Sequence, residues 1–245
     1  MILHIPHSSL KIPKLAKKSY LINSAKIKEL KIFFCDLFTN DLYNCGKKVI
    51  AKYSRLFVDM ERFEDDEQEP MSKLGMGMIY THSHNGEEIS KPTQKHINKA
   101  KVVYHKHHSK LDAMVQNELS KYNKCLIVDC HSFSDKLAES IFKAKEFPDV
   151  CIGYDNDFKD EEITNLIVQY FKNLGYSVKE NYPYSGSMVA NVAYKAKDTR
   201  VKSVMIEINK RVYLNGNKKS KNYKRLKEQI KTLLRIINKK FYGEI

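Results

Sequence analysis

The chain has 245 residues with a formal net charge of +14, and 42% of its residues are hydrophobic and 11% aromatic. This length and composition exclude a disordered protein and predict one α/β domain, residues 1–245, that buries a substantial core. No apolar run approaches the roughly 20 residues that a helix needs to cross a bilayer, so a membrane-spanning protein is not expected.

The predicted elements alternate between short apolar, β-branched runs and long amphipathic stretches, which is typical of an α/β sheet covered by helices. In chain order we predict the strand Ile2–Pro6, the helix Ala25–Leu42, the strands Lys48–Ala51 and Leu56–Asp59, the helix Gln94–Tyr122, the strands Cys125–Cys130 and Val150–Gly153, the helix Glu161–Leu174, the strands Ser177–Asn181 and Ser203–Ile208, and the helix Tyr223–Lys239. The segment Glu61–Pro92 has no clear periodicity, and a loop that long inside a compact domain is usually functional. We therefore expect a mixed, mostly parallel sheet flanked by helices.

The charge and the cysteines restrict the class of protein. Only six of the 43 basic residues are arginine, and the lysines are spread along the chain, so the densest run, from Lys218 to Lys227, indicates a solvated helix face rather than a nucleic-acid surface. Five cysteines without a CxxC pair argue against a disulfide framework or a cysteine-rich zinc module. The N-terminus has neither a basic leader nor a long apolar core. We expect a reduced, cytoplasmic protein with no membrane or nucleic-acid partner.

Four apolar runs end in polar residues of the kind that build catalytic sites. His7, Asp59 and His131 each follow or end such a run, and Glu207 lies within a fourth. In an open α/β sheet, ligands bind beyond the carboxyl ends of the strands. Two imidazoles and a carboxylate, with one position left for water, form a common ligand set for catalytic zinc. This conjunction predicts a metal site.

Each residue also has a structural interpretation. A histidine after a strand is often only hydrogen-bonded, and Asp59 could cap a turn or pair with Arg62. Glu207 is harder to explain in that way, because burying an unpaired carboxylate costs several kcal/mol. On the long helix, His108 shares a face with Tyr104 and is a candidate for the sheet edge.

The remaining polar residues leave alternatives open. His82 and His84, in the loop, are expected to be exposed polar residues. The segment from Asn181 to Ser187 is typical of a turn, and its Asn181 and Tyr184 could line a pocket or merely close a loop.

The order of these motifs resembles the N-formylglutamate amidohydrolase family over nearly the whole chain. The matching residues are Pro6-His7-Ser8-Ser9, Val58-Asp59-Met60-Glu61-Arg62, Tyr104 to His108 with Leu111, Asp129-Cys130-His131-Ser132, Asn181-Tyr182-Pro183-Tyr184 with Gly186, and Glu207-Ile208-Asn209 with Arg211 and Tyr213. The resemblance implies a metal-dependent hydrolase that cleaves the formyl amide of an acyl amino acid. It also implies a fold similar to zinc carboxypeptidases and aspartoacylases.

The chain departs from the family's pattern at several positions. Ser9 replaces the glycine of Pro-His-Ser-Gly, Asp59-Met60-Glu61-Arg62 replaces Asp-Leu-Asn-Arg, and Ser187 replaces the second of two glycines. Leu10 stands where the His-x-x-Glu pair of zinc carboxypeptidases has its glutamate. The carboxylate ligand must therefore come from elsewhere, with Asp59 as the first choice and Glu61 as the second.

The mechanism implied by this resemblance uses Zn²⁺, or another divalent metal ion, held by His7, Asp59 and His131 to acidify water and polarise the amide carbonyl. Glu207 is expected to act as general base and then general acid, with His108 as the second candidate. Arg62 and Arg211 are expected to bind a substrate carboxylate, and Asn181 and Tyr184 to contact the substrate. The Glu61–Pro92 loop is expected to close over the site.

Competing hypotheses are an amidase for another acyl amino acid or a peptidoglycan fragment, then a non-catalytic family member acting as a binding protein, and last a nucleic-acid-binding module.

Overall fold

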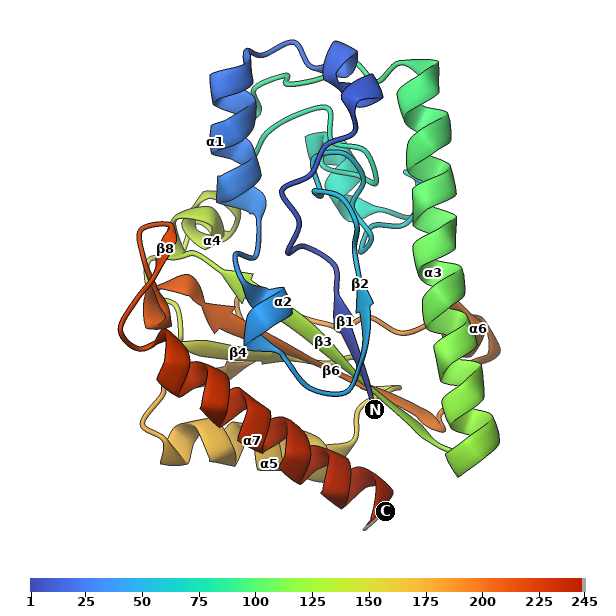
Figure 1. Ribbon diagram of the computed structural model, residues 1–245, viewed down its shortest axis with the longest axis vertical. Coiled ribbons are helices and arrows are strands. Elements are labelled where there is room, and N and C mark those ends of the chain that lie inside the picture. Colours follow the sequence, from blue (N-terminus) through green and yellow to red (C-terminus); the bar gives the residue numbers. More distant parts are fainter. Residues whose placement is uncertain (244–245) are drawn as a thin grey trace. The chain divides into compact units, whose positions relative to one another are not determined.

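The computed structural model of the protein describes residues 1–243, which divide into two compact units (Figure 1). The sheet unit consists of Met1–Ile5, Phe38–Val49 and residues 110–243, and the loop unit consists of Pro6–Leu37 and Ile50–Ser109. Within residues 1–243, no helix combines the length and the apolar character needed to cross a bilayer.

The sheet unit is built on six strands. Their order across the sheet is β2 (Lys47–Ile50), β1 (Ile2–Ile5), β3 (Cys125–Phe133), β6 (Val201–Asn209), β4 (Val150–Gly153) and β5 (Val178–Glu180). The pairs β1–β3, β3–β6 and β4–β5 are parallel, and β4–β6 is antiparallel. The predicted mixed, mostly parallel α/β sheet is confirmed.

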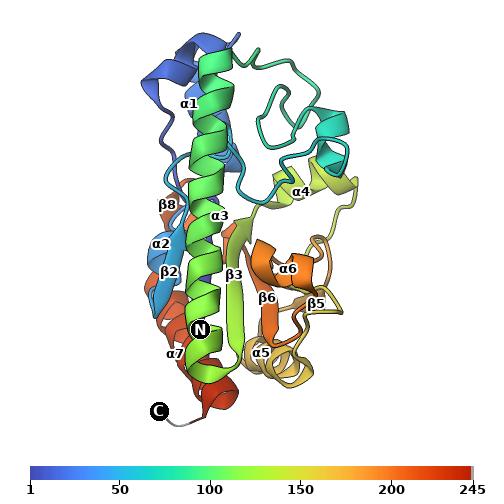
Figure 2. The ribbon, with the colours of Figure 1, turned by 90° about the vertical axis from the view of Figure 1, so that its right-hand side faces the viewer.

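Helices cover the two faces of this sheet. Figure 2 shows α6 (Asn191–Ala196) on one side of β3 and β6 and α7 (Tyr223–Tyr242) on the other. α5 (Glu161–Asn173) runs beside α7, and the two are joined by a hydrogen bond from Tyr170 Oη to the Gln229 carbonyl (2.8 Å).

On one face of the sheet, the hydrophobic core contains Ile127 of β3 and Val201 of β6, which pack with Leu111 and Val115 of α3 (Gln94–Tyr122). Because side chains alternate along a strand, positions 129 and 131 of β3 leave the same face as Ile127.

The loop unit has little regular structure. It contains α1 (Ser24–Phe34), the 3₁₀ turns η1 (Lys14–Ser19) and η2 (Pro70–Leu74), and the first part of α3. Its core is formed by apolar side chains of irregular segments and α3: Ala16, Ala51, Phe57, Val58, Met60, Met78, Ala100 and Tyr104.

The predicted strand Leu56–Asp59 is wrong. The segment is a buried turn, in which the N–H groups of Phe57 and Val58 both bond to the Ser54 carbonyl (2.9 and 3.3 Å). Its apolar residues are buried in the core of the loop unit, and a buried turn carries the same apolar signal as a short strand.

The predicted helix Ala25–Leu42 is interrupted. It ends at Phe34, and a second, four-residue helix, α2 (Thr39–Leu42), begins after Phe38, which has a left-handed backbone (φ 66°). In the interruption, the N–H of Asp36 bonds to the His7 carbonyl (3.0 Å) instead of continuing the helix. Besides the 3₁₀ turns, four short α-helices and strands were not predicted: α4 (Asp135–Phe142), α6, β7 (Leu214–Asn215) and β8 (Lys218–Lys219).

Candidate active site

The sheet unit carries a buried aspartate between two histidines. The strand register pairs Asp129 with His4 of β1. His4 Nδ1 lies 2.8 Å from Asp129 Oδ1, and His131 Nε2, two residues along β3, lies 3.1 Å from the same oxygen. The N–H of Met188 donates to the other oxygen at 2.9 Å. Burial alone raises the pKa of Asp129, but His131 and His4 hold this pKa well below its usual range. The carboxylate therefore stays charged and orients both imidazoles.

Glu207 lies next to His131 on the neighbouring strand. The register of β3 and β6 pairs the two residues, so their side chains leave the same face on strands about 4.8 Å apart. Glu207 is only 6% exposed. On its other side it pairs with Cys151 of β4, whose pKa is raised to about 12 by burial and then by the charge of Glu207. A buried carboxylate beside an imidazole has the environment of a group that moves protons.

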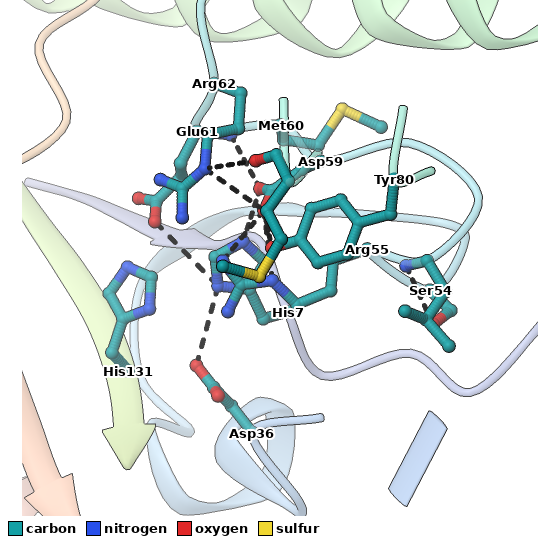
Figure 3. A network of polar contacts seen from close by, with 12 residues as sticks. His7, Asp36, Ser54, Arg55, Asp59, Met60, Glu61, Arg62, Tyr80 and His131 are labelled. Atoms are coloured by element: carbon teal, nitrogen blue, oxygen red, sulfur yellow. Dashed lines mark hydrogen bonds and ion pairs between the residues drawn. The ribbon is translucent and has the colours of Figure 1, made fainter. Parts of the chain in front are cut away.

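The loop unit holds a second buried aspartate, Asp59, whose two oxygens accept five hydrogen bonds (Figure 3). Oδ1 accepts from His7 Nε2 (2.7 Å) and from the N–H of Glu61 (3.1 Å). Oδ2 accepts from Nε and Nη2 of Arg55 (3.0 and 2.7 Å) and from Tyr80 Oη (3.0 Å). Asp59 is therefore an anchor for His7 and Arg55.

Neighbouring basic groups keep this buried carboxylate charged. Burial raises the pKa of Asp59, but Arg55, His7 and Arg62 outweigh it and hold the pKa well below its usual range. Burial likewise opposes the charge of Arg55, but the nearby Asp59 raises the pKa of that guanidinium. The pair therefore remains ionised inside the loop unit.

The other nitrogen of His7 faces two further carboxylates. His7 Nδ1 lies 3.7 Å from Asp36 Oδ2 and 3.8 Å from Glu61 Oε2 (Figure 3). Two tetrahedral zinc ligands with bonds of about 2.1 Å lie about 3.4 Å apart, so these spacings and donor types fit a shared ion. His4, His7, Glu61, Asp129 and His131 are among the described residues whose side chains could hold a metal ion.

Sequence reasoning missed Asp36 and Arg55. Asp36 is a lone carboxylate inside the apolar run from Ile32 to Phe38, and that isolation was the available signal. Arg55 stands four residues before Asp59, and this spacing lets the two side chains meet across a turn, whereas in the predicted strand it would leave them about 13 Å apart.

Arg62 differs from Arg55 in how its guanidinium is used. Its Nε donates to the Met76 carbonyl (3.3 Å) and lies 3.8 Å from both Asp59 Oδ2 and Glu69 Oε1. Within residues 1–243, its two terminal nitrogens make no hydrogen bond. With 21% of its side chain exposed, Arg62 is partly accessible to solvent.

The sequence also places the chain among known proteins. The sequence model of the family described as N-formylglutamate amidohydrolase matches residues 1–214. The chain belongs to the N-formylglutamate amidohydrolase family. Among solved structures, that of N-formylglutamate amidohydrolase from Ralstonia eutropha JMP134 is 19% identical and has a TM-score of 0.79, with 97% of this chain and 92% of that chain covered. The gene product Atu2144 from Agrobacterium tumefaciens is 18% identical and has a TM-score of 0.63, with 97% and 91% covered. No curated protein sequence matches the chain.

Membership of this family confirms the resemblance predicted from the motifs and supports a hydrolase that acts on the amide of a small molecule. At 18 and 19% identity, the two structures show a shared fold.

Arg211, the second arginine of the family motifs, already has acid partners. Its Nη1 donates to both oxygens of Asp135 (2.7 and 2.8 Å), and its Nη2 donates to the Phe147 carbonyl (2.8 Å) and Asp149 Oδ1 (3.0 Å). To bind a substrate carboxylate, Arg211 would have to give up these bonds. Its substrate role remains a prediction that these contacts disfavour.

The other predicted residues also have structural contacts. His108 Nε2 donates to the Met60 carbonyl (2.9 Å). Asn181 has a left-handed backbone (φ 48°), and its Oδ1 accepts from the N–H of Tyr154 (2.9 Å), which closes a loop. The ring of Tyr184 packs on Phe133 (5.6 Å between centroids). Their catalytic and substrate roles stay predictions.

His82 and His84 are half-buried rather than exposed, and they line a cavity of about 400 Å³ together with other residues between positions 72 and 86.

Proposed function

We propose that the protein hydrolyses the amide bond of an N-acyl amino acid such as N-formylglutamate, with the help of a bound divalent metal ion such as zinc. Family membership supports the amide substrate. One observation carries the metal: His7 and His131 each direct Nε2 at a buried, charged aspartate. Histidines that bind metals usually make this contact with their second nitrogen, because it fixes the ring and its tautomer.

The proposed histidine ligands are the two that the sequence motifs predict, His7 and His131. Since Nε2 of each ring faces an aspartate, Nδ1 is the nitrogen that would bind the ion. The third ligand is then Asp36 or Glu61, which approach His7 Nδ1, rather than Asp59. A fold similar to zinc carboxypeptidases and aspartoacylases is part of this proposal.

When bound, such an ion supplies a positive charge that acidifies water and polarises an amide carbonyl. The carboxylate of Glu207 accepts the proton of the attacking water and delivers it to the leaving nitrogen. Its burial and its place beside His131 support this role.

Substrate recognition is assigned first to Arg62. Its unused terminal nitrogens match the two oxygens of a substrate carboxylate, and a bidentate pair of this kind fixes the orientation as well as the affinity. Arg211, Asn181 and Tyr184 are secondary candidates.

The test is elemental analysis of the purified protein, followed by a hydrolysis screen with and without a chelator. The substrates are N-formylglutamate, other N-acyl amino acids and peptidoglycan fragments. We expect about one zinc or similar ion per chain and hydrolysis that stops with chelator and returns with metal. Hydrolysis that persists after complete metal removal would contradict the metal proposal. Bound metal without any turnover would favour a binding protein.

A further inference from the structure

Four side chains of the loop unit donate hydrogen bonds to main-chain carbonyls of the segment from Leu56 to Arg62. The donor–acceptor pairs are Tyr20 Oη to Leu56 (2.9 Å), His96 Nε2 to Phe57 (3.0 Å), His108 Nε2 to Met60 (2.9 Å) and Tyr104 Oη to Arg62 (2.8 Å). This segment is a buried turn, so these bonds supply partners that a sheet would otherwise provide.

Three of the four donors come from one side of α3. His96, Tyr104 and His108 are eight and four residues apart, which places them on one face of a helix. The rings of Tyr104 and His108 lie 4.2 Å apart between centroids. Their two acceptors, the carbonyls of Met60 and Arg62, stand on either side of Glu61.

Both donors suit a fixed bond. Burial raises the pKa of Tyr104 to about 12, so its hydroxyl keeps its proton and donates. His108 is 5% exposed, and its Nε2 proton is directed at a carbonyl, which accepts a hydrogen bond but takes up no proton.

We propose that Tyr104 and His108 are positioning residues: by holding the carbonyls before and after Glu61, they fix the directions of the Glu61 carboxylate and the Arg62 guanidinium. His108 then acts through the main chain and does not carry the substrate's proton. The roles of Glu61 and Arg62 rest on the proposed function, whereas the placement of the segment does not.

The experiment compares Tyr104→Phe and His108→Asn with matched controls. Tyr20→Phe and His96→Asn remove bonds of the same kind from the same segment, but at Leu56 and Phe57, before Asp59. His108→Gln, whose longer amide can still reach a carbonyl, is the conservative variant.

The first measurement is amide hydrogen exchange of the metal-free protein, which needs neither metal nor substrate. We expect faster exchange at residues 60–63 in Tyr104→Phe and His108→Asn, partial recovery in His108→Gln, and unchanged exchange there in the two controls. Unchanged exchange in both test variants, or the same increase in the controls, overturns the proposal.

The second measurement uses zinc affinity by competition with a chromogenic chelator, and steady-state kinetics on N-formylglutamate. We expect His108→Asn to weaken zinc binding about 10–100-fold, as loss of a supporting partner does. Tyr104→Phe should raise KM about 10-fold with little change in kcat, because it loosens Arg62. A fall of about 10²–10⁴-fold in kcat of His108→Asn with zinc affinity and KM unchanged would instead identify a proton carrier. Absence of zinc binding and turnover in the parent protein would refute the proposed function, while the exchange result would still decide the positioning.

Discussion

Two buried aspartates, one in each unit, perform the same task by different means. Asp129 in the sheet unit and Asp59 in the loop unit each face Nε2 of a histidine, at 3.1 and 2.7 Å, and each stays ionised despite its burial. On β3, strand register and the two-residue alternation place the partners, and imidazoles lower the pKa of the carboxylate. In the loop unit, a guanidinium has the largest share of this effect.

The comparison shows how sensitive the placement of each aspartate is to single substitutions. The sheet positions its carboxylate with main-chain hydrogen bonds that do not depend on side-chain identity. The loop unit replaces them with side-chain donors, so single substitutions there remove both charge balance and geometry.

The largest expected effect comes from the histidine of each pair. His7→Ala and His131→Ala should each lose the bound ion, since two protein ligands hold zinc far less firmly than three. Metal content of purified variants measures this. Asp36→Asn and Glu61→Gln show which carboxylate binds, and only one of them should behave like His7→Ala. Full occupancy in both histidine variants would mean that the two pairs are structural.

Glu207→Gln tests whether the sheet unit also moves the proton. The substitution keeps shape and metal but removes the proton acceptor, so kcat should fall about 10²–10⁴-fold. Steady-state kinetics measure kcat, and metal content shows whether the ion is still bound. Asn209→Asp is not a suitable control, because Asn209 donates a hydrogen bond to Asp135 that the substitution would also remove. Undiminished turnover would move the proton-transfer role elsewhere.

Arg55→Met sharpens the comparison in the loop unit. Removing one partner of a buried ion pair leaves an uncompensated charge, so the free energy of unfolding should fall by about 3 kcal/mol. Arg55→Lys should lose less, because it keeps the charge but not the two-pronged contact. Urea denaturation at neutral pH measures both. If Arg55→Met is as stable as the parent, Asp59 does not depend on this guanidinium.

Much of the regular structure could be predicted because it is periodic or continuously apolar. The bounds of α3 and β4 match the prediction, and β3 and β6 extend it by a few residues. The errors fall where tertiary contacts replace local ones. The bond from Asp36 N to the His7 carbonyl ends α1 early, and it joins residues that sequence patterns do not connect.

The site was only partly predictable for the same reason. His131 and Glu207 are predicted to lie together because strands carry them to one sheet edge, and the register of β3 and β6 pairs them. Their roles stay predictions. Asp59 is predicted as a ligand from its motif. The sequence does not show that five donors, Arg55 above all, already occupy its two oxygens. A carboxylate's role depends on which of its oxygens are already engaged.

Replacing either of the two motif arginines by lysine should have a smaller effect, and the quantity affected should differ between the two units. Arg62→Lys should raise KM for acidic substrates about 10-fold, because lysine cannot form the bidentate pair. Arg211→Lys should leave KM nearly unchanged and lower stability, because its guanidinium holds Asp135 and Asp149. Kinetics on N-formylglutamate and on its uncharged amide analogue separate the two. A KM increase in Arg211→Lys alone would reverse the assignment.

The smallest effect concerns the dependence of the loop unit on pH. His96 is fully buried between Ser19 Oγ (3.0 Å) and the Phe57 carbonyl (3.0 Å), and burial lowers its pKa below the usual 6.5 even though the Phe57 bond opposes this. The unfolded chain therefore takes up a proton at a higher pH than the folded one. Stability should be fully present above about pH 6.5 and decline as the pH falls toward the folded pKa, with a slope of at most about 1.4 kcal/mol per pH unit for one proton.

The carboxylates with lowered pKa values, Asp59 and Asp129, lose their contributions only below their usual value of 3.8, so they do not mask this window. His96→Asn should be less stable than the parent at pH 8, because it loses its packing on Phe57, with which the imidazole is stacked at 4.8 Å between centroids. Its free energy of unfolding should nevertheless change less between pH 7 and pH 5. Urea denaturation at both values measures the two slopes. Equal slopes in the parent and the variant would show that His96 does not set the acid sensitivity of the loop unit, and that its buried ring is tolerated in the charged form.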